Sequence, residues 1–266
     1  MRTFATTWGV GDYPAMARLL TPAAEAVVAA AGVRPDDRVL DVATGTGNAA
    51  LLAAQRGART TGVDLEPTLL ALARRRATDA GLTVDWRLGD AIRMPLPDDS
   101  ADVVLSVFGV MYASDHDAVA RELSRVCAPG GRVALAAWTP GDFLPAMGQV
   151  LGDYLPPPPA GSVPPSRWGD RESARRLLEA AGLRVISAVS HRLHLSFPDG
   201  DAATTLLIDT AGHVVAERDR LVAQGRWEAM RANLRSFVGE RGVTDGDHFR
   251  LELEYLVMTA TPGPRT

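Results

Sequence analysis

The stretch that decides the fold reads Val39-Leu40-Asp41-Val42-Ala43-Thr44-Gly45-Thr46-Gly47-Asn48. An acidic residue lies at the end of an apolar run that is typical of a buried strand, and two glycines follow in the turn. Glycine allows positive φ and lets a ligand approach the backbone without meeting a Cβ atom. A helix that begins near Asn48 would present unpaired N–H groups. The stretch therefore predicts a turn that holds a nucleotide-like cofactor.

Asp41 helps to identify the cofactor that the glycine turn would bind. Gly45, Gly47 and Ala50 also satisfy the loose dinucleotide pattern, and Asp64 follows about twenty residues later, as a ribose-binding acid should. A carboxylate just before a pyrophosphate site would be repelled, whereas a sulfonium and an ammonium group would be attracted to it. Asp41 therefore favours S-adenosylmethionine, and an NAD-dependent oxidoreductase remains as the rival.

Alternating hydrophobic patterns predict strands at about 38–43, 59–64, 83–87, 102–107 and 132–138, separated by helical stretches. A helix at 171–181 capped by Asp170, a strand at about 184–197 and a last strand at about 249–259 follow. This β-α-β order predicts a parallel sheet that binds its ligand at the carboxyl ends of the strands. The candidate residues that follow predicted strands are Asp41, Asp64, Asp90 and Ser106.

Four further segments, in order, make the chain resemble the class I S-adenosylmethionine-dependent methyltransferases, particularly small-molecule enzymes of the ubiquinone/menaquinone-biosynthesis type. The resemblance spans roughly residues 10 to 198. The segments are Gly62-Val63-Asp64-Leu65 (second strand and ribose-binding acid), Leu88-Gly89-Asp90-Ala91 (adenine loop), Ser100-Ala101-Asp102-Val103-Val104-Leu105-Ser106 (fourth strand) and Arg121-Glu122-Leu123-Ser124-Arg125-Val126-Cys127-Ala128-Pro129-Gly130-Gly131-Arg132-Val133 (helix, turn and fifth strand).

The resemblance implies an α/β, Rossmann-like fold: a seven-stranded, mostly parallel sheet with an antiparallel last strand, helices on both faces and lid insertions. It also implies a helix over about 8–31 that covers the cofactor, with Tyr13 facing the methionine carboxylate. The expected contacts to S-adenosylmethionine, and to the product S-adenosylhomocysteine, come from Tyr13, Asp41, Thr44, Gly45, Gly47, Asp64, Leu65, Asp90, Ala91 and Ser106.

Simpler structural interpretations stay open for several of these residues. Asp64 could cap the helix that begins near Pro67, and Asp90 could be an ordinary turn residue. Asp41 could support the glycine turn through backbone N–H groups without touching a ligand. Tyr13 could serve ordinary packing.

His116 is the candidate catalytic base, because it lies just beyond the fourth strand, where the acceptor should meet the methyl group. The alternative is a polar residue in the first turn of the next helix, with Ser114 or Asp115 as the cap. Further candidates could line an apolar, ring-bearing acceptor or serve only packing, and His191 is more typical of a core or lid histidine. These candidates are Tyr112, Trp138, Trp168 and His191.

Segments 140–169 and 199–247 do not belong to the minimal fold. The first contains Pro156-Pro157-Pro158-Pro159 and Pro164-Pro165, a stiff extended piece that we interpret as part of a lid. A linker between domains is disfavoured, because another helix and strand follow it. The second carries apolar residues on helical faces and is expected to cover an apolar pocket, although it could extend the core. We expect one methyltransferase domain over 1–266.

Composition limits the substrate and the compartment. The chain has 266 residues, 46% of them hydrophobic, and a net charge of −4. Without a basic run, a nucleic-acid substrate is not expected. Cys127, the single cysteine, is expected to be a small buried apolar residue, and no cysteine-histidine spacing indicates a metal. No basic-apolar leader or membrane-length apolar run is found, so a cytoplasmic protein is expected.

The sequence thus predicts methyl transfer from S-adenosylmethionine to a small, apolar or aromatic metabolite in natural-product biosynthesis, with a small-molecule acceptor as the partner and a homodimer left open. The atom methylated, O, N or C, is not determined. Two alternatives remain: a cyclisation or rearrangement in which the cofactor is no methyl donor, and a non-catalytic ligand-binding protein.

Overall fold

The computed structural model describes residues 8–158 and 161–264. The chain divides into two compact units. Unit 1 comprises Met1–Leu20, Pro140–Ser162 and Arg192–Glu254, and unit 2 comprises Thr21–Thr139, Val163–His191 and Tyr255–Thr266. Each unit is described by itself below.

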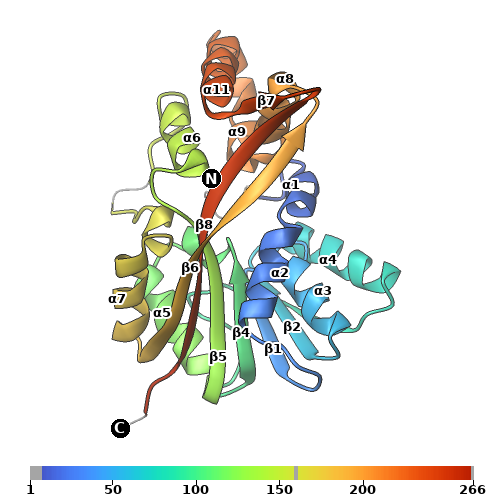
Figure 1. Cartoon of the computed structure of the whole chain (residues 1–266), viewed down its shortest axis with the longest axis vertical. Helices are drawn as coiled ribbons and strands as arrows, with labels where there is room; N and C mark the ends of the chain where they lie inside the picture. Colours follow the sequence, from blue (N-terminus) through green and yellow to red (C-terminus); the bar gives the residue numbers. More distant parts are fainter. Residues whose placement is uncertain (1–7, 159–160, 265–266) are drawn as a thin grey trace. The chain divides into compact units, whose positions relative to one another are not determined.

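Unit 2 contains the parallel strands (Figure 1). Strand β1 pairs with β2 and β4, β2 pairs with β3, and β4 pairs with β5, all in parallel. The register places Asp41 opposite Gly62 on one side and Leu105 on the other. The bounds are β1 Arg38–Val42, β2 Arg59–Asp64, β3 Val84–Leu88, β4 Ala101–Val107 and β5 Cys127–Trp138. The parallel sheet expected from the sequence is therefore confirmed.

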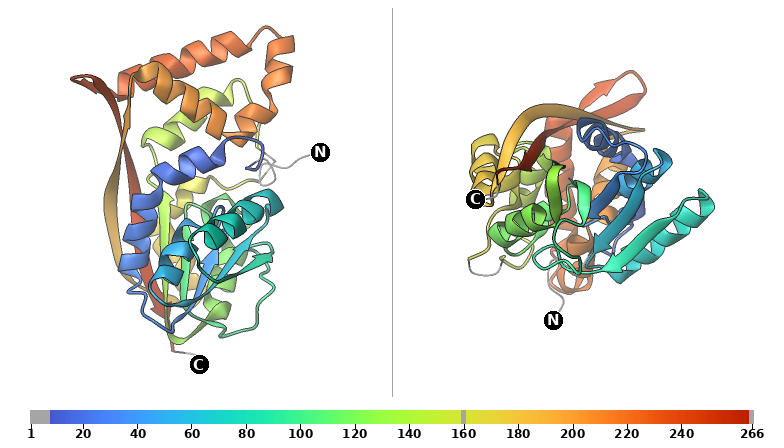
Figure 2. Two further views of the ribbon diagram at one scale, coloured as in Figure 1. Left: turned by 90° about the vertical axis from the view of Figure 1, so that its right-hand side faces the viewer. Right: turned by 90° about the horizontal axis from the view of Figure 1, so that it is seen from below.

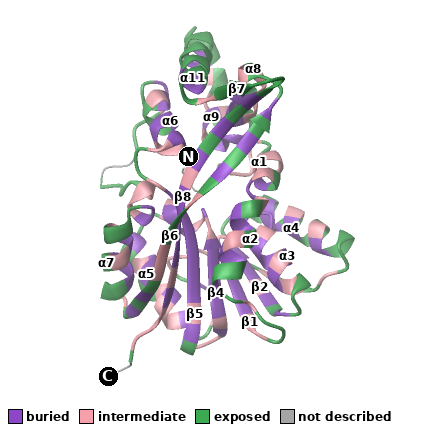
Figure 3. Ribbon diagram, viewed as in Figure 1, coloured by how far each residue is buried: buried purple, intermediate pink, exposed green. Residues whose placement is uncertain are grey.

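Helices cover both faces of these strands. Helices α2 and α3 pack on one side, and α5 and α7 lie on the other (Figure 2). Strands covered on both faces bury continuous apolar runs, and Val103, Val104 and Leu105 are fully buried (Figure 3). The helices of unit 2 are α2 Thr21–Ala30, α3 Asn48–Gln55, α4 Pro67–Asp79, α5 His116–Val126 and α7 Arg171–Ala180, with the short turns η2 Val110–Tyr112 and η3 Pro165–Trp168.

The strand order is β3-β2-β1-β4-β5-β8-β6, and β8 (His248–Pro262) runs antiparallel to β5. The antiparallel last strand is thus confirmed. The sheet has eight strands rather than the expected seven, because β7 (Val243–Asp245) pairs with the start of β8. The turn between them contains Gly246 at a φ of 60°, a conformation that glycine adopts without strain. Strand β6 spans Leu183–Phe197.

Unit 1 is mainly helical. Helix α8 packs against α1 and α11, and α11 also packs against α6, where the rings of Phe143 and Phe237 lie 5.1 Å apart. Segment 199–247 is therefore largely helical, as its apolar pattern indicated. The bounds are α1 Tyr13–Leu19, α6 Phe143–Gly152, α8 Gly200–Thr210, α9 Gly212–Ala216, α10 Arg218–Ala223 and α11 Trp227–Arg241.

The single helix expected over 8–31 is two helices, α1 and α2, which belong to different units. Helix α1 ends at Leu19, and α2 begins with Thr21 and Pro22. Proline has no N–H group and its ring restricts the preceding residue, so an uninterrupted helix through this point is disfavoured.

Candidate functional site

The carboxyl end of β1 is organised around Asp41, which is 2% exposed. Its Oδ2 atom accepts hydrogen bonds from the Thr44 hydroxyl at 2.6 Å and from the backbone N–H of Ala50 at 3.0 Å. Burial raises the pKa of this carboxyl from 3.8 to about 7. The structure therefore shows the loop-supporting role that the sequence left open, and direct contact of Asp41 or Thr44 with a ligand stays a prediction.

The glycine turn after β1 has the expected backbone. Gly45 and Gly47 have φ values of 56° and 86°, and α3 begins at Asn48 as predicted. A Cβ atom on Gly47 would lie 2.6 Å from the Trp86 ring. Gly47 is thus required by the packing of an aromatic side chain as well as by its φ.

Two residues that sequence reasoning missed support this turn. Trp86 on β3 packs against Gly47 and Gly62, and Arg76 on α4 donates to the Thr46 carbonyl at 2.7 Å and to Asn48 Oδ1 at 2.8 Å. Neither lies near the glycines in sequence, and neither belongs to a recognisable motif. Only the packing of α4 and β3 on the turn reveals them.

Asp64 connects the turns after β1 and β2. Its Oδ2 accepts from the Gly45 N–H at 2.6 Å, and its Oδ1 accepts from the Glu66 N–H at 2.8 Å. Burial raises the pKa of this carboxyl. Glu66, not Asp64, is the N-cap of α4, so the helix-cap interpretation of Asp64 is wrong. The next side chain, Leu65, is 39% exposed and offers an apolar surface beside the acid.

Asp90 and Ala91 lie in the loop after β3. Asp90 Oδ1 accepts from the Ile92 N–H at 3.1 Å, which is the ordinary turn contact that the sequence also allowed. Helix α5 holds the rest of this loop. Glu122 accepts from the Met94 N–H at 2.7 Å, and Arg125 donates to the Leu96 carbonyl at 2.8 Å.

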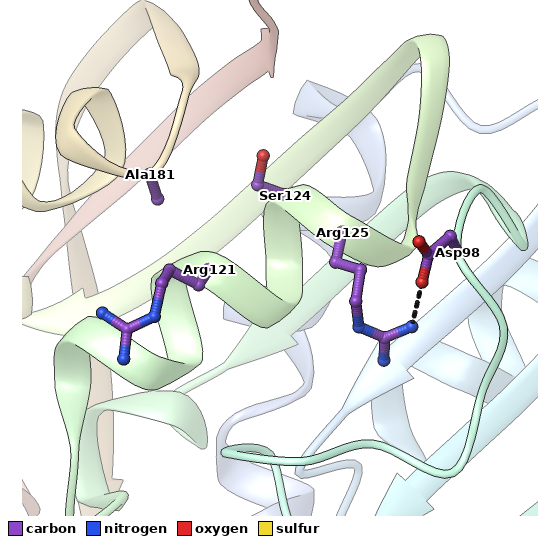
Figure 4. Close-up of a pocket in the computed structure, with 5 residues that line it drawn as sticks. All are labelled: Asp98, Arg121, Ser124, Arg125 and Ala181. Carbon is purple, nitrogen blue, oxygen red and sulfur yellow. Dashed lines mark hydrogen bonds and ion pairs between the residues drawn. The ribbon is translucent and has the colours of Figure 1, made fainter. Parts of the chain in front are cut away.

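Figure 4 shows the same arginine in a pocket of about 310 Å³. Arg125 pairs there with Asp98 at 2.8 Å, and the lining residues are Asp98, Arg121, Ser124, Arg125 and Ala181. These α5 residues lie toward the end of the helix, and Asp98 precedes β4, so the pocket is at the opposite end of the strands from Asp41 and Asp64. Glu122 and Arg125 belong to the stretch that resembles the family in sequence. They therefore hold the loop that follows Asp90 from the end of the strands opposite to Asp41 and Asp64.

Ser106 ties β4 to β1. Its hydroxyl, which is fully buried, donates to the Val42 carbonyl at 2.7 Å and accepts from the Val110 N–H at 3.2 Å. A direct ligand contact would have to compete with these bonds and stays a prediction. Close by, Ala43 and Phe108 adopt φ values of 52° and 55°, which are uncommon for residues other than glycine and cluster at functional sites.

His116 is the first residue of α5, and its neighbour Asp115 caps the helix by accepting from the Ala118 N–H. The side chain is 1% exposed. Its Nε2 atom lies 3.0 Å from the Met111 carbonyl, and its Nδ1 atom is buried with no hydrogen-bond partner. Burial lowers the pKa of the imidazole. The helix-start position matches the simpler interpretation, and the orphaned nitrogen is what a base would require.

The structure brings three of the candidate acceptor residues, Tyr112, Trp138 and His191, into one aromatic cluster, and Trp168 lies beside His116. Trp138 stacks on Phe108 at 3.6 Å and is in hydrogen-bond contact with Tyr112, whose pKa burial raises to about 12. Tyr255 lies edge-on to Trp138, and His191 stacks on Tyr255 at 5.4 Å. The rings of Trp168 and His116 are 5.8 Å apart.

Tyr13 lies in unit 1 as the first residue of α1 and contacts Trp8 edge-on at 5.7 Å. Its expected contact with the methionine carboxylate stays a prediction. Within residues 8–158 and 161–264, no group of three or more acidic, histidine or cysteine side chains could hold a metal ion. None of the described helices is both long and apolar enough to cross a membrane. Cys127 is buried, as expected.

Comparison with known proteins gives the same assignment. A methyltransferase domain family matches residues 40–135. An uncharacterized protein of Mycobacterium tuberculosis is 42% identical over 97% of this chain and 93% of its own length. The ubiquinone/menaquinone biosynthesis C-methyltransferase UbiE of Cupriavidus necator is 33% identical over 60% of this chain and 72% of its own. The crystal structure of the [4+2]-cyclase SpnF superposes with a TM-score of 0.56 at 21% identity, covering 92% of this chain and 81% of that one, and so shares the fold. The chain belongs to the class I S-adenosylmethionine-dependent methyltransferases.

Proposed function

We propose that this protein transfers a methyl group from S-adenosylmethionine to a small, apolar or aromatic metabolite of a natural-product pathway. The observation that carries the proposal is the acid at the end of β2: Asp64 is held by three backbone N–H groups beside the exposed Leu65 side chain. A carboxylate next to an apolar side chain suits a ribose next to an adenine ring. The relative with a quinone-biosynthesis name supports a ring-bearing acceptor.

The residues at the strand ends fit this cofactor. The Asp64 carboxylate accepts backbone N–H groups from Gly45, Glu66 and Leu65, and of its four lone pairs one remains for a ribose hydroxyl. Asp90 uses Oδ1 in its turn, which leaves Oδ2 for an adenine amino group. The buried Asp41 supplies a carboxyl that favours a cationic ligand once it is ionised. The glycine turn is held at positive φ at Gly45 and Gly47, a conformation that glycine adopts without strain.

S-adenosylmethionine supplies a methyl group on a cationic sulfur that leaves as a neutral thioether. The acceptor atom forms the new bond to the methyl carbon, the carbon–sulfur electron pair goes to sulfur, and an acceptor proton, where there is one, goes to a base. Positioning in a dry site provides much of the rate. The protein's task is therefore to orient the acceptor, and the buried His116 is the candidate for the proton.

The test is calorimetric titration of the purified protein with S-adenosylmethionine, S-adenosylhomocysteine and NAD in parallel. Binding of the first two alone supports the proposal. Binding of NAD alone would reject it, because the glycine turn would then serve a dinucleotide.

A cyclisation or rearrangement is the second candidate, since a [4+2]-cyclase shares this fold. Mass spectrometry distinguishes the two: methyl transfer adds a methylene unit to the acceptor and yields S-adenosylhomocysteine, whereas a cyclisation leaves the mass unchanged.

Several expectations from the sequence stay predictions. They are the cytoplasmic location, the homodimer, the single-domain boundaries and the lid roles of 140–169 and 199–247.

A further inference from the structure

Unit 2 contains buried side-chain atoms that have no hydrogen-bond partner. In the described ranges, the buried side-chain atoms that lack a hydrogen bond are Ser100 Oγ, His116 Nδ1, Thr139 Oγ1, Trp168 Nε1 and Thr261 Oγ1. Each such atom has lost its hydrogen bonds to water without a replacement, so native proteins retain few of them without a reason.

Three of these atoms belong to elements that pack on one another. Turn η3, which ends at Trp168, contacts both β5 and η2. The backbone of Gly169 lies directly against Trp138 and Thr139, since a Cβ on Gly169 would overlap the Trp138 carbonyl. The rings of Trp168 and His116 lie 5.8 Å apart, and the two side chains are 3% and 1% exposed. The three residues that carry these atoms, His116, Thr139 and Trp168, thus belong to one group of elements that pack on one another.

The hydrogen-bonding roles of two members are determined. The Met111 carbonyl can only accept, so His116 Nε2 carries a proton, and in the neutral ring Nδ1 is then a pure acceptor. Burial lowers the pKa of His116 and favours this neutral form; Arg167 lowers the pKa further, while Asp115 and Asp117 oppose the shift. The indole Nε1–H of Trp168 is a pure donor.

A pure acceptor beside a pure donor matches a group that both donates and accepts. A hydroxyl does this with one oxygen atom. An ether accepts but cannot donate, an ammonium donates but cannot accept, and a carboxylate cannot donate. The stacked rings of Phe108 and Trp138 belong to the same unit. Phe108 lies between β4 and η2, and Trp138 ends β5, which η3 contacts. The two rings provide an apolar setting.

We propose that His116 Nδ1 and Trp168 Nε1 together bind one hydroxyl of the methyl acceptor, and that this hydroxyl is carried by an aromatic skeleton. This inference rests on the proposed function and narrows it to oxygen methylation. Nδ1 accepts the hydroxyl proton, and the indole N–H holds the oxygen in place. The methyl ether that results can no longer donate to Nδ1, so product binds more weakly than acceptor.

The test uses ¹⁵N NMR of the full-length protein saturated with S-adenosylhomocysteine and titrated with phenol, anisole and toluene. Phenol is expected to move the Trp168 indole N–H resonance downfield and to shift the His116 Nδ1 resonance, and both shifts should level off as phenol saturates the site. Anisole and toluene should produce smaller shifts. Trp168→Phe removes the indole resonance and so assigns it. Equal responses to all three probes, or no response to phenol, would overturn the proposal.

Trp168→Phe also provides a quantitative check, because it keeps an aromatic ring and removes the N–H donor together with the five-membered ring. We expect phenol affinity to fall by about 3- to 10-fold, the size of one hydrogen bond. The matched control Ser100→Ala removes an orphaned hydroxyl at the start of β4 and should leave phenol affinity unchanged. Unchanged phenol binding in Trp168→Phe would overturn the proposal. Calorimetry with S-adenosylhomocysteine on the same samples separates this result from a failure of the proposed cofactor site.

Discussion

The turns after β1 and β2 differ from the residues around the ends of β4 and β5 in whether their polar side chains have hydrogen-bond partners. In the first region Asp41, Thr44, Asp64 and Arg76 all have hydrogen-bond partners within the chain. In the second, the orphaned atoms of His116, Thr139 and Trp168 have none. The polar side chains of the first region are each held by the chain itself, whereas the second region has buried side-chain atoms with no partner at all.

This difference fits the division of labour in a methyltransferase. A cofactor common to many acceptors is best bound by a rigid frame, because pre-organised contacts need no reorganisation. An acceptor must be recognised by groups that are free to bind it. The four predictions below test whether the first region is a self-supporting frame and the second an open site.

The largest effect is expected at Gly47. Gly47→Ala places a side chain at a φ of 86° and against the Trp86 ring. We expect a loss of about 2–4 kcal/mol in the free energy of unfolding, from left-handed strain plus overpacking. Urea denaturation measures it.

Gly57→Ala is the matched control, because its φ is 83° but the nearest atom is 3.5 Å from the added Cβ. It should cost only the backbone term, about 1–2 kcal/mol. Equal losses in the two variants would mean that Trp86 does not support the turn.

Next is Asp64→Ala. Removing charge-assisted hydrogen bonds to the ribose should weaken cofactor binding by about 1.5–3 kcal/mol, roughly 10- to 150-fold. Isothermal titration with S-adenosylmethionine measures the change. Asp85→Ala, which deletes an exposed carboxylate on β3, serves as the control and should bind normally. A folded Asp64→Ala protein with native affinity would remove Asp64 from the site.

A pair of isosteric substitutions tests the comparison directly. Thr44→Val leaves the buried Asp41 carboxyl without its 2.6 Å hydroxyl donor and should cost about 1–3 kcal/mol of stability. Thr139→Val removes a hydroxyl that has no partner and should be neutral or stabilising. Chemical denaturation of both variants measures the two changes in the free energy of unfolding. If Thr139→Val lost as much stability as Thr44→Val, the two regions would not differ as described.

The smallest effect is a pH dependence at Asp41. Because burial raises its pKa to about 7, the carboxyl of the free protein is protonated below that pH and ionised above it. A cationic sulfonium prefers the ionised form, so affinity for S-adenosylmethionine relative to S-adenosylhomocysteine should rise as pH increases through about 7. The change is on the order of 1 kcal/mol.

S-adenosylmethionine and S-adenosylhomocysteine share the same amino and carboxyl groups. The ratio of the two binding affinities therefore cancels the effect of titrating those groups. Asp41→Asn keeps an acceptor oxygen for Thr44 and Ala50 but cannot ionise, so its ratio should be flat across the same pH range. A wild-type ratio that is already flat would contradict the electrostatic role of Asp41.

Local pattern was enough for the parallel strands, the glycine turn and the acid after β2, because strand alternation and positive-φ glycines leave their mark within a few residues of one another. Local pattern also placed Asp170 as the cap of α7. The antiparallel direction of β8 was instead implied by the family resemblance. Local pattern failed at the break between α1 and α2 and at β7, where a proline and a three-residue strand carry little periodic signal.

By itself, then, the sequence determined the kind of fold, the methyltransferase family and the edge of the sheet where the candidate residues collect. Tertiary structure alone decided which groups there are already satisfied. Trp86, Arg76 and Glu66 meet the turns from separate elements, and the orphaned nitrogens of His116 and Trp168 come from residues 52 positions apart in the numbering. Hydrogen-bond satisfaction and side-chain packing depend on distances in space, and no periodicity along the chain records them.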